Sequence, residues 1–300
     1  MQLSFSASNI ISNVINRSSI LNIVYEPKNS LIDHTLFTLP YNFYLFNNNR
    51  LNFSTDNVID LPERFYGINS YNLLLSHSLE RFTNNNNISA LCHIPAIVLI
   101  DETRPYKKED RHIINEKTKQ ITKIFLSQES FEVMGKPSKS FVVPIGIPSM
   151  ISSSLSRTDN QKKVLLLDNS NMSQQIKKVL HSRQITCDTL PMHSNIETIK
   201  NIFANYKFCI DLTNQYRYNL LAAVSAGCVG ITLKQNPEIC PYIHHVDTSE
   251  DILSFISSQQ EVITNVVDQQ QYINKNYPYE TFIKQLTSII NTTSKEVFLQ

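Results

Sequence analysis

Short apolar runs alternate with mixed, partly charged segments along most of this chain. A compact run such as Ala96–Ile100 indicates a buried strand, because an all-apolar stretch of this length suits a strand covered on both faces. The segments at 107–119 and 128–134 favour helices instead. In the first half, strands are expected at residues 21–25, 41–46, 70–76, 96–100, 121–126 and 141–145.

A connection rich in proline and serine, near residues 148–161, precedes a second and more regular alternation. The tail that follows it is expected to be helical, without a strand partner, and to wrap back across the chain. Strands are expected at 164–167, 185–190, 208–212 and 228–233, and helices at 173–182, 195–205, 216–226, 250–258, 261–274 and 279–290.

The alternation predicts an α/β protein made of two doubly wound, Rossmann-like domains with a cleft between them and helices at the carboxyl terminus. We expect an amino-terminal domain over residues 1–150 and a carboxyl-terminal domain over 151–276. A last helix within 277–300 is expected to pack back on the first domain. Ligands should lie at the carboxyl ends of the strands.

The segment 207–232 is the most informative part of the chain. An apolar strand runs into Thr213 and Asn214, which can cap the next helix, and Gly227 ends that helix before a second strand. The turn at 214–219 therefore combines a strand carboxyl end with a helix amino end, where backbone N–H groups favour an anion. Arg217 adds a cation, so the turn suits a phosphate; a packed corner with a surface arginine is the alternative.

Composition narrows the class of protein. The 300 residues are 41% hydrophobic and 18% charged, enough for two globular domains. A net charge of +1 disfavours a dedicated DNA-binding protein, although a local basic groove stays open. Five scattered cysteines without metal-type spacing indicate reduced thiols. With no signal peptide or membrane-spanning run, a cytoplasmic protein is expected.

Four stretches, in order, resemble segments of one enzyme family. Residues 94–101 resemble its proline-led acceptor-domain strand, 122–130 the strand and turn that follow, 141–148 its hinge, and 218–232 its donor helix and strand. The layout over about residues 70–290 resembles the GT-B glycosyltransferases, most closely the retaining group called family 4. The resemblance implies a nucleotide-sugar donor on the second domain and an acceptor on the first, and no metal or other cofactor is expected.

The departures from the family pattern concern its charged residues. The two glutamates that flank the family's donor helix correspond here to Asn214 and Ala222, and the family's histidine position holds Asp101. Asn214 can still hydrogen-bond sugar hydroxyls, whereas Ala222 offers nothing polar. The sequence therefore supports the architecture more firmly than one subfamily's chemistry.

The candidate donor site is centred on Arg217, which would stabilise the leaving diphosphate. Pro191 and Met192 form an apolar shelf where the resemblance places the nucleobase, although ordinary loop packing explains them equally well. Further candidate contacts to the nucleotide sugar are Asn169, Asn214, Tyr216, Tyr218 and Asn219.

On the acceptor side, Asp101 and Glu102 follow a buried strand. Asp101 would deprotonate the acceptor hydroxyl in an inverting reaction or position the sugar in a retaining one; an ion pair with Arg104 is the alternative. His77, also at a strand end, is a further candidate for substrate binding, against the alternative of a structural histidine.

The predicted function is transfer of a sugar from a nucleotide sugar to a hydroxyl group. The acceptor is left open among a glycan, a lipid-linked sugar, a protein and a hydroxymethylated DNA base. A GT-B-shaped binding or scaffold protein without catalysis is the alternative, because Asn214 and Ala222 stand where the family has glutamates.

Overall fold

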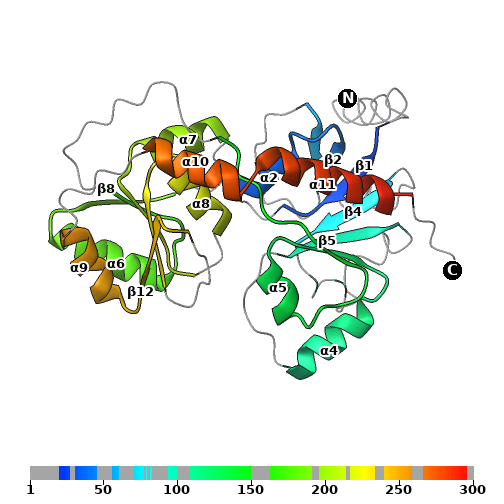
Figure 1. Ribbon diagram of the computed structural model, residues 1–300, viewed down its shortest axis with the longest axis horizontal. Coiled ribbons are helices and arrows are strands. Elements are labelled where there is room, and N and C mark those ends of the chain that lie inside the picture. Colours follow the sequence, from blue (N-terminus) through cyan, green and yellow to red (C-terminus); the bar gives the residue numbers. More distant parts are fainter. Residues whose placement is uncertain are drawn as a thin grey trace, which may run out of the picture.

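Figure 1 shows two α/β units side by side, with the long carboxyl-terminal helices running from one to the other in this computed structural model. Each unit is built on one parallel sheet. The structure describes residues 20–27, 31–45, 56–60, 71–77, 79, 82, 94–100, 108–149, 163–190, 196–213, 217–233, 240–258 and 266–295.

The first sheet has seven strands in the order β3-β2-β1-β4-β5-β6-β7, all parallel. Its central strands are buried along their whole length, which explains their continuous apolar runs. The strands are β1 Asn22–Tyr25, β2 Asn42–Leu45, β3 Val58–Asp60, β4 Leu73–Ser76, β5 Ala96–Ile100, β6 Thr122–Phe125 and β7 Ser140–Val142. The helices of this half are α2 Leu31–Leu36, α4 Lys108–Lys117 and α5 Gln128–Val133.

The second sheet has five parallel strands in the order β12-β11-β10-β8-β9. Its strands are β8 Lys163–Leu166, β9 Thr186–Thr189, β10 Phe208–Asp211, β11 Val229–Leu233 and β12 Ile243–Val246. The helices are α6 Asn171–Ser182, α7 Ile196–Ala204, α8 Arg217–Ser225, α9 Ser249–Ser258, α10 Val266–Asn276 and α11 Tyr279–Thr293. The prediction of two parallel-sheet α/β domains is confirmed.

Three elements were not predicted: α2, β3 and β12. The first two are short, and β12 carries two histidines, His244 and His245, between its apolar ends. The expectation that the tail lacks a strand partner was wrong for its first helix, because α9 follows β12 directly and packs on it. Half-buried histidines hid this edge strand from a search for apolar runs.

Helix α8 is buried along its length. Every residue from Tyr218 to Ser225 is buried, and the helix contacts β10, β11, α10 and α2. It ends as predicted at Gly227, whose φ of 92° only glycine adopts freely. Gly227 N donates to Val224 O at 2.8 Å and Cys228 N to Ala223 O at 2.9 Å, which is a Schellman ending.

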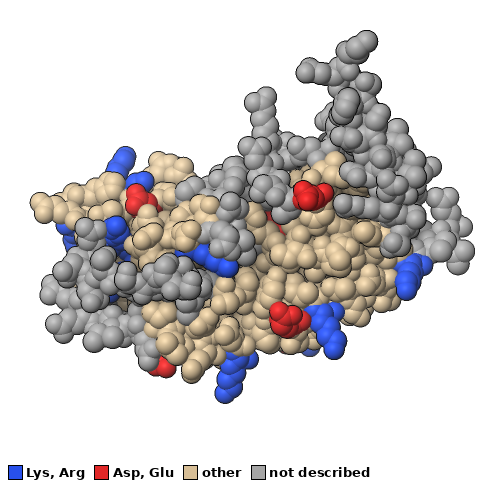
Figure 2. Space-filling view, turned by 90° about the horizontal axis from the view of Figure 1, so that it is seen from above, with Lys and Arg blue, Asp and Glu red and all other residues tan. Residues whose placement is uncertain are grey.

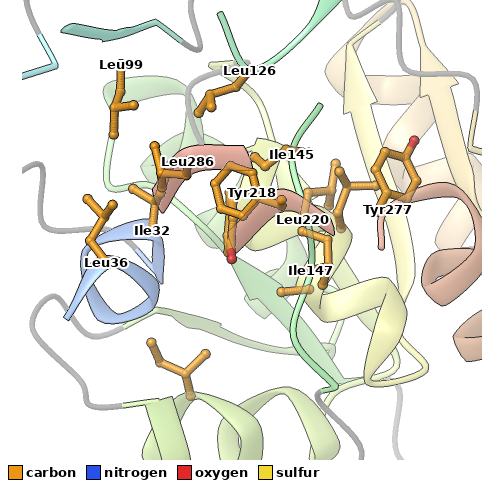
Figure 3. Close-up of a cluster of buried hydrophobic side chains, with 14 of the residues drawn as sticks. Ile32, Leu36, Leu99, Leu126, Ile145, Ile147, Tyr218, Leu220, Tyr277 and Leu286 are labelled. Carbon is orange, nitrogen blue, oxygen red and sulfur yellow. The ribbon is translucent and has the colours of Figure 1, made fainter. Parts of the chain in front are cut away.

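The carboxyl-terminal helix α11 returns to the first unit and contacts β5. Where it begins, Ile147 N donates to Tyr277 O at 3.1 Å. A Cβ on Gly146 would lie 2.8 Å from the Tyr279 Cα and 2.9 Å from the Pro278 carbonyl, so only glycine permits this approach. One hydrophobic cluster joins both units: Figure 3 shows its members from α2, β5, the 145–147 segment, α8 and α11. Within the described residues, no helix is long and apolar enough to cross a membrane.

Candidate functional site

The strand order of each sheet points to one place where a ligand can bind. In an open parallel sheet, the two strands at which the chain reverses its direction of winding leave a crevice at their carboxyl ends. In the first sheet this switch point lies between β1 and β4, and in the second between β8 and β10. Both places carry charged side chains.

At the second switch point, Asp168 follows β8 and is 6% exposed. Its Oδ1 accepts hydrogen bonds from Ser170 N at 2.8 Å and from Ser173 Oγ at 2.6 Å. Ser170 also caps α6, because its side chain accepts from Ser173 N. The other carboxylate oxygen, Oδ2, is buried and has no hydrogen-bond partner in the described part of the chain. A buried carboxylate oxygen of this kind suits a donor group on a ligand.

The neighbouring strand, β10, ends in Asp211, which is fully buried. Its Oδ1 accepts from Thr213 N at 3.0 Å and from Thr213 Oγ1 at 3.2 Å, and this bends the chain at the strand end. Arg217 then opens α8 with a half-buried side chain whose Nη1 is shielded from solvent. A guanidinium at a helix amino end supplies the charge that an anionic ligand needs.

At the first switch point, three side chains form a hydrogen-bonded cluster. Tyr25 ends β1, Asp33 belongs to α2, and His77 follows β4. The Tyr25 hydroxyl donates to Asp33 Oδ1 and lies 2.7 Å from His77 Nε2. His77 Nε2 is also 3.7 Å from Asp33 Oδ1. Tyr25 and Asp33 are fully buried, while the His77 side chain is 9% exposed. We call these residues the Tyr25 cluster.

Packing fixes the Tyr25 ring and with it the cluster. The ring meets Phe37, Phe43 and His77 edge to face, with centroid distances of 5.6, 5.9 and 5.7 Å. Burial, and then the charge of Asp33, raises the pKa of Tyr25 well above its ordinary value, so the phenol stays protonated and keeps its hydrogen for Asp33.

One hydrogen bond joins the two units next to these places. The Tyr218 hydroxyl of α8 lies 2.7 Å from Thr35 Oγ1 of α2, and both side chains are buried. Thr35 is two residues from Asp33, and Tyr218 follows Arg217. The helix of the first switch point therefore packs directly against the helix of the second.

The structure separates the predicted site residues into groups. His77 joins the Tyr25 cluster, Arg217 begins α8, and Asn169 is exposed between β8 and α6. Tyr218 is 3% exposed and its hydroxyl is paired with Thr35, so this placement does not support the expected contact to a nucleotide. Asn219 is likewise buried. Six predicted residues lie outside the described residues: Asp101, Glu102, Pro191, Met192, Asn214 and Tyr216.

Sequence comparison finds no match, whereas structural comparison finds proteins with the same fold. No protein-family model matches the chain, and no curated protein matches it. Solved structures align over nearly all of it: Anabaena HepE in complex with UDP-glucose has a TM-score of 0.65 at 11% identity, covering 91% of this chain and 100% of that one. The chain has the GT-B fold.

Two further GT-B structures extend the match. Sucrose-phosphate synthase from Thermosynechococcus elongatus has a TM-score of 0.60 at 8% identity and covers 91% of this chain and 98% of its own. The lipopolysaccharide outer core galactosyltransferase WaaB has a TM-score of 0.54 at 9% identity, with coverages of 91% and 99%. The GT-B likeness establishes the architecture, and the chemistry has to be argued from this chain's own residues.

Sequence reasoning missed Tyr25 and Asp33. Tyr25 was read as one more apolar strand residue, and the helix that carries Asp33 was not predicted. The cluster joins residues 8 and 52 positions apart, which no periodic pattern reveals. What brings them together is the strand order, since Tyr25 and His77 stand at the carboxyl ends of the neighbouring strands β1 and β4.

Proposed function

We propose that this protein is a glycosyltransferase that moves a sugar from a nucleotide-sugar donor to a hydroxyl acceptor. The observation that carries the proposal is the contact of the two switch points through α2 and α8 in a chain with the GT-B fold. HepE, one of the matching structures, is in complex with UDP-glucose, which makes UDP-glucose the first donor to test.

The proposed donor site is the second switch point. Arg217 stabilises the diphosphate, and the buried Oδ2 of Asp168 accepts a hydrogen bond from a donor hydroxyl. The remaining donor contacts, proposed from the sequence, are Asn169, Pro191, Met192, Asn214, Tyr216 and Asn219.

The acceptor binds at the first switch point in this proposal. Asp101 and Glu102, which follow β5, remain proposed contacts there. The acceptor unit is proposed to span residues 1–150 and the donor unit 151–276, with the 277–300 segment on the first unit. Membership of the retaining family 4 group is not part of the proposal, because the buried Ala222 stands at one of its glutamate positions.

A donor panel tests this assignment. UDP-, GDP- and CMP-sugars are added to the wild type in the presence of EDTA, since no metal is expected, and the melting temperature is measured. We expect one nucleotide class to raise it. Arg217→Ala should then abolish the shift and reduce transfer and donor hydrolysis by about 100-fold or more, because it removes a charge at the leaving diphosphate.

Arg183→Ala is the matched control. Arg183 follows the carboxyl end of α6, away from the strand carboxyl ends, and is exposed. The Arg183→Ala substitution removes the same charge from the same unit as Arg217→Ala does, and it should leave donor binding unchanged. Full activity in Arg217→Ala would contradict the donor site, and no shift with any nucleotide would contradict the function.

A binding protein without transferase activity is the second candidate, supported by Ala222. This residue is fully buried in α8 and offers no carboxylate to the donor. A shift of the melting temperature with a nucleotide sugar, but neither hydrolysis nor transfer with any acceptor, would favour it.

The acceptor panel includes a glycan, a lipid-linked sugar, a protein and a hydroxymethylated DNA. On the face in Figure 2, the Lys and Arg side chains of the described residues are spread out among Asp and Glu rather than gathered.

A further inference from the structure

The Tyr25 cluster has the arrangement of a proton acceptor held in one orientation. We propose that His77 is the general base that takes the proton from the acceptor hydroxyl, with Tyr25 and Asp33 as its positioning residues. This rests on the proposed function and names an acceptor-side catalytic residue other than Asp101, the candidate that the sequence predicted.

Hydrogen bonding fixes which nitrogen of His77 carries the proton. Tyr25 has a single hydroxyl hydrogen, and it donates that hydrogen to Asp33. The Tyr25 oxygen can therefore only accept from His77, so Nε2 of the neutral ring must be the N–H nitrogen. Nδ1 is left with its lone pair, and no described residue donates to it. A neutral imidazole with one nitrogen anchored and the other available is the form a general base needs.

The position of the cluster also fits the role. His77 follows β4 at the first switch point, and unlike its fully buried partners its side chain retains some exposure. The helix that supplies Asp33 also supplies Thr35, which reaches α8 of the donor unit. The base is thus held by the element that contacts the donor unit, close to where donor and acceptor must meet.

The proposed step balances as a single displacement. The acceptor oxygen forms a bond to the anomeric carbon, the bond from that carbon to the diphosphate breaks, and its electron pair leaves with the diphosphate. The acceptor proton passes to Nδ1 of His77, which becomes an imidazolium stabilised by Asp33, 3.7 Å from Nε2. In this displacement the acceptor oxygen attacks the face opposite the diphosphate, so the anomeric configuration inverts.

The polar groups in and beside the Tyr25 cluster come from three elements, α2, β1 and β4. Asp33 lies on α2, Tyr25 ends β1, and Glu26 follows it and accepts from Ser76 Oγ of β4 at 3.0 Å. The Asp33 carboxylate, 3.7 Å from Nε2, favours the positive charge that forms on His77 in the step.

His77→Gln tests the base directly. The Gln amide can still donate to Tyr25 but cannot take up a proton, so kcat for transfer should fall about 100-fold or more while donor affinity and donor-induced stabilisation persist. His112→Gln, at an exposed histidine of α4, is the matched control and should behave as wild type. Transfer by His77→Gln within about threefold of wild type, or a product with retained configuration, would overturn the proposal.

A spectroscopic test needs no substrate. In ¹⁵N-labelled protein the His77 signals, assigned by their loss in His77→Gln, should show the Nε2–H tautomer. Tyr25→Phe, which leaves the ring in place, should convert them to a mixture of tautomers and lower transfer without changing donor binding. An Nδ1–H tautomer in wild type would overturn the inference even if the protein is a transferase. Failure to bind any nucleotide sugar would overturn the proposed function instead.

Discussion

Each switch point contains a buried aspartate, but the two aspartates differ in how their carboxylate oxygens are hydrogen-bonded. At the first, the carboxylate of Asp33 is enclosed with Tyr25 and His77 in one hydrogen-bonded cluster. At the second, Asp168 Oδ1 accepts hydrogen bonds at the amino end of α6, whereas Oδ2 has no partner in the described residues. The hydrogen bonds among the three side chains fix their geometry at the first place, whereas the unpaired oxygen at the second can accept from a ligand. This difference agrees with the proposed proton transfer at the first place and the proposed donor binding at the second.

The largest effect on stability is expected from Asp33→Ala. The change leaves the buried Tyr25 hydroxyl without its acceptor and creates a cavity, so the free energy of unfolding should fall by about 2–4 kcal/mol. Urea unfolding at neutral pH measures it. A loss below about 0.5 kcal/mol would contradict the hydrogen bond between the Tyr25 hydroxyl and Asp33.

Asp168→Asn should behave in the opposite way. The amide oxygen can still accept from Ser170 N and Ser173 Oγ, so unfolding should change by less than about 1 kcal/mol. The second oxygen becomes an NH₂ group, which cannot accept from a ligand hydroxyl, and donor affinity should weaken about tenfold. Titration calorimetry with the nucleotide sugar that stabilises the wild type measures this change in affinity. Unchanged affinity would remove Asp168 from the donor site.

Alkaline pH should lower the free energy of unfolding through Tyr25, at the first switch point. The folded protein holds the pKa of Tyr25 above its ordinary value, mainly by burial, so the unfolded chain loses this proton first as pH rises. The stabilisation is therefore complete below about pH 10 and is lost above it, at about 1.4 kcal/mol per pH unit. Unfolding measured from pH 8 to 11 should show a shallower loss in Tyr25→Phe than in wild type; parallel curves would contradict the burial of a protonated phenol.

A smaller effect than that of Asp33→Ala is expected at the contact between the two places. Thr35→Val and Tyr218→Phe each remove one hydroxyl from the same hydrogen bond. Each should cost about 1 kcal/mol, and the double variant should cost little more than either alone. The free energy of unfolding of the wild type, both single variants and the double variant completes a double-mutant cycle. Strictly additive losses would show that the two hydroxyls do not interact.

Prediction from sequence succeeded where local rules decide and failed where distant residues meet. The strand ending at Asp211, the helix α8 and its stop at Gly227 follow from an apolar run, a capping signal and a glycine. Tyr218 could not be placed this way, because its spacing does not tell whether its ring faces a ligand or α2. The Tyr25 cluster depends on three segments brought together by the strand order. His77 was selected only because it follows a strand.

The return of α11 to the first unit has a consequence for how the protein is made. Phe282, Leu286 and Ile290 belong to the same core as strands β1 to β5, and Asn291 accepts a 3.0 Å hydrogen bond from the Tyr41 hydroxyl. These residues follow the second unit along the chain, so the core of the first unit is completed only after the second unit has been synthesised. A nascent or truncated chain ending before Tyr279 would leave the apolar side of that sheet uncovered, and with it the support beneath the very strands that present Tyr25 and His77.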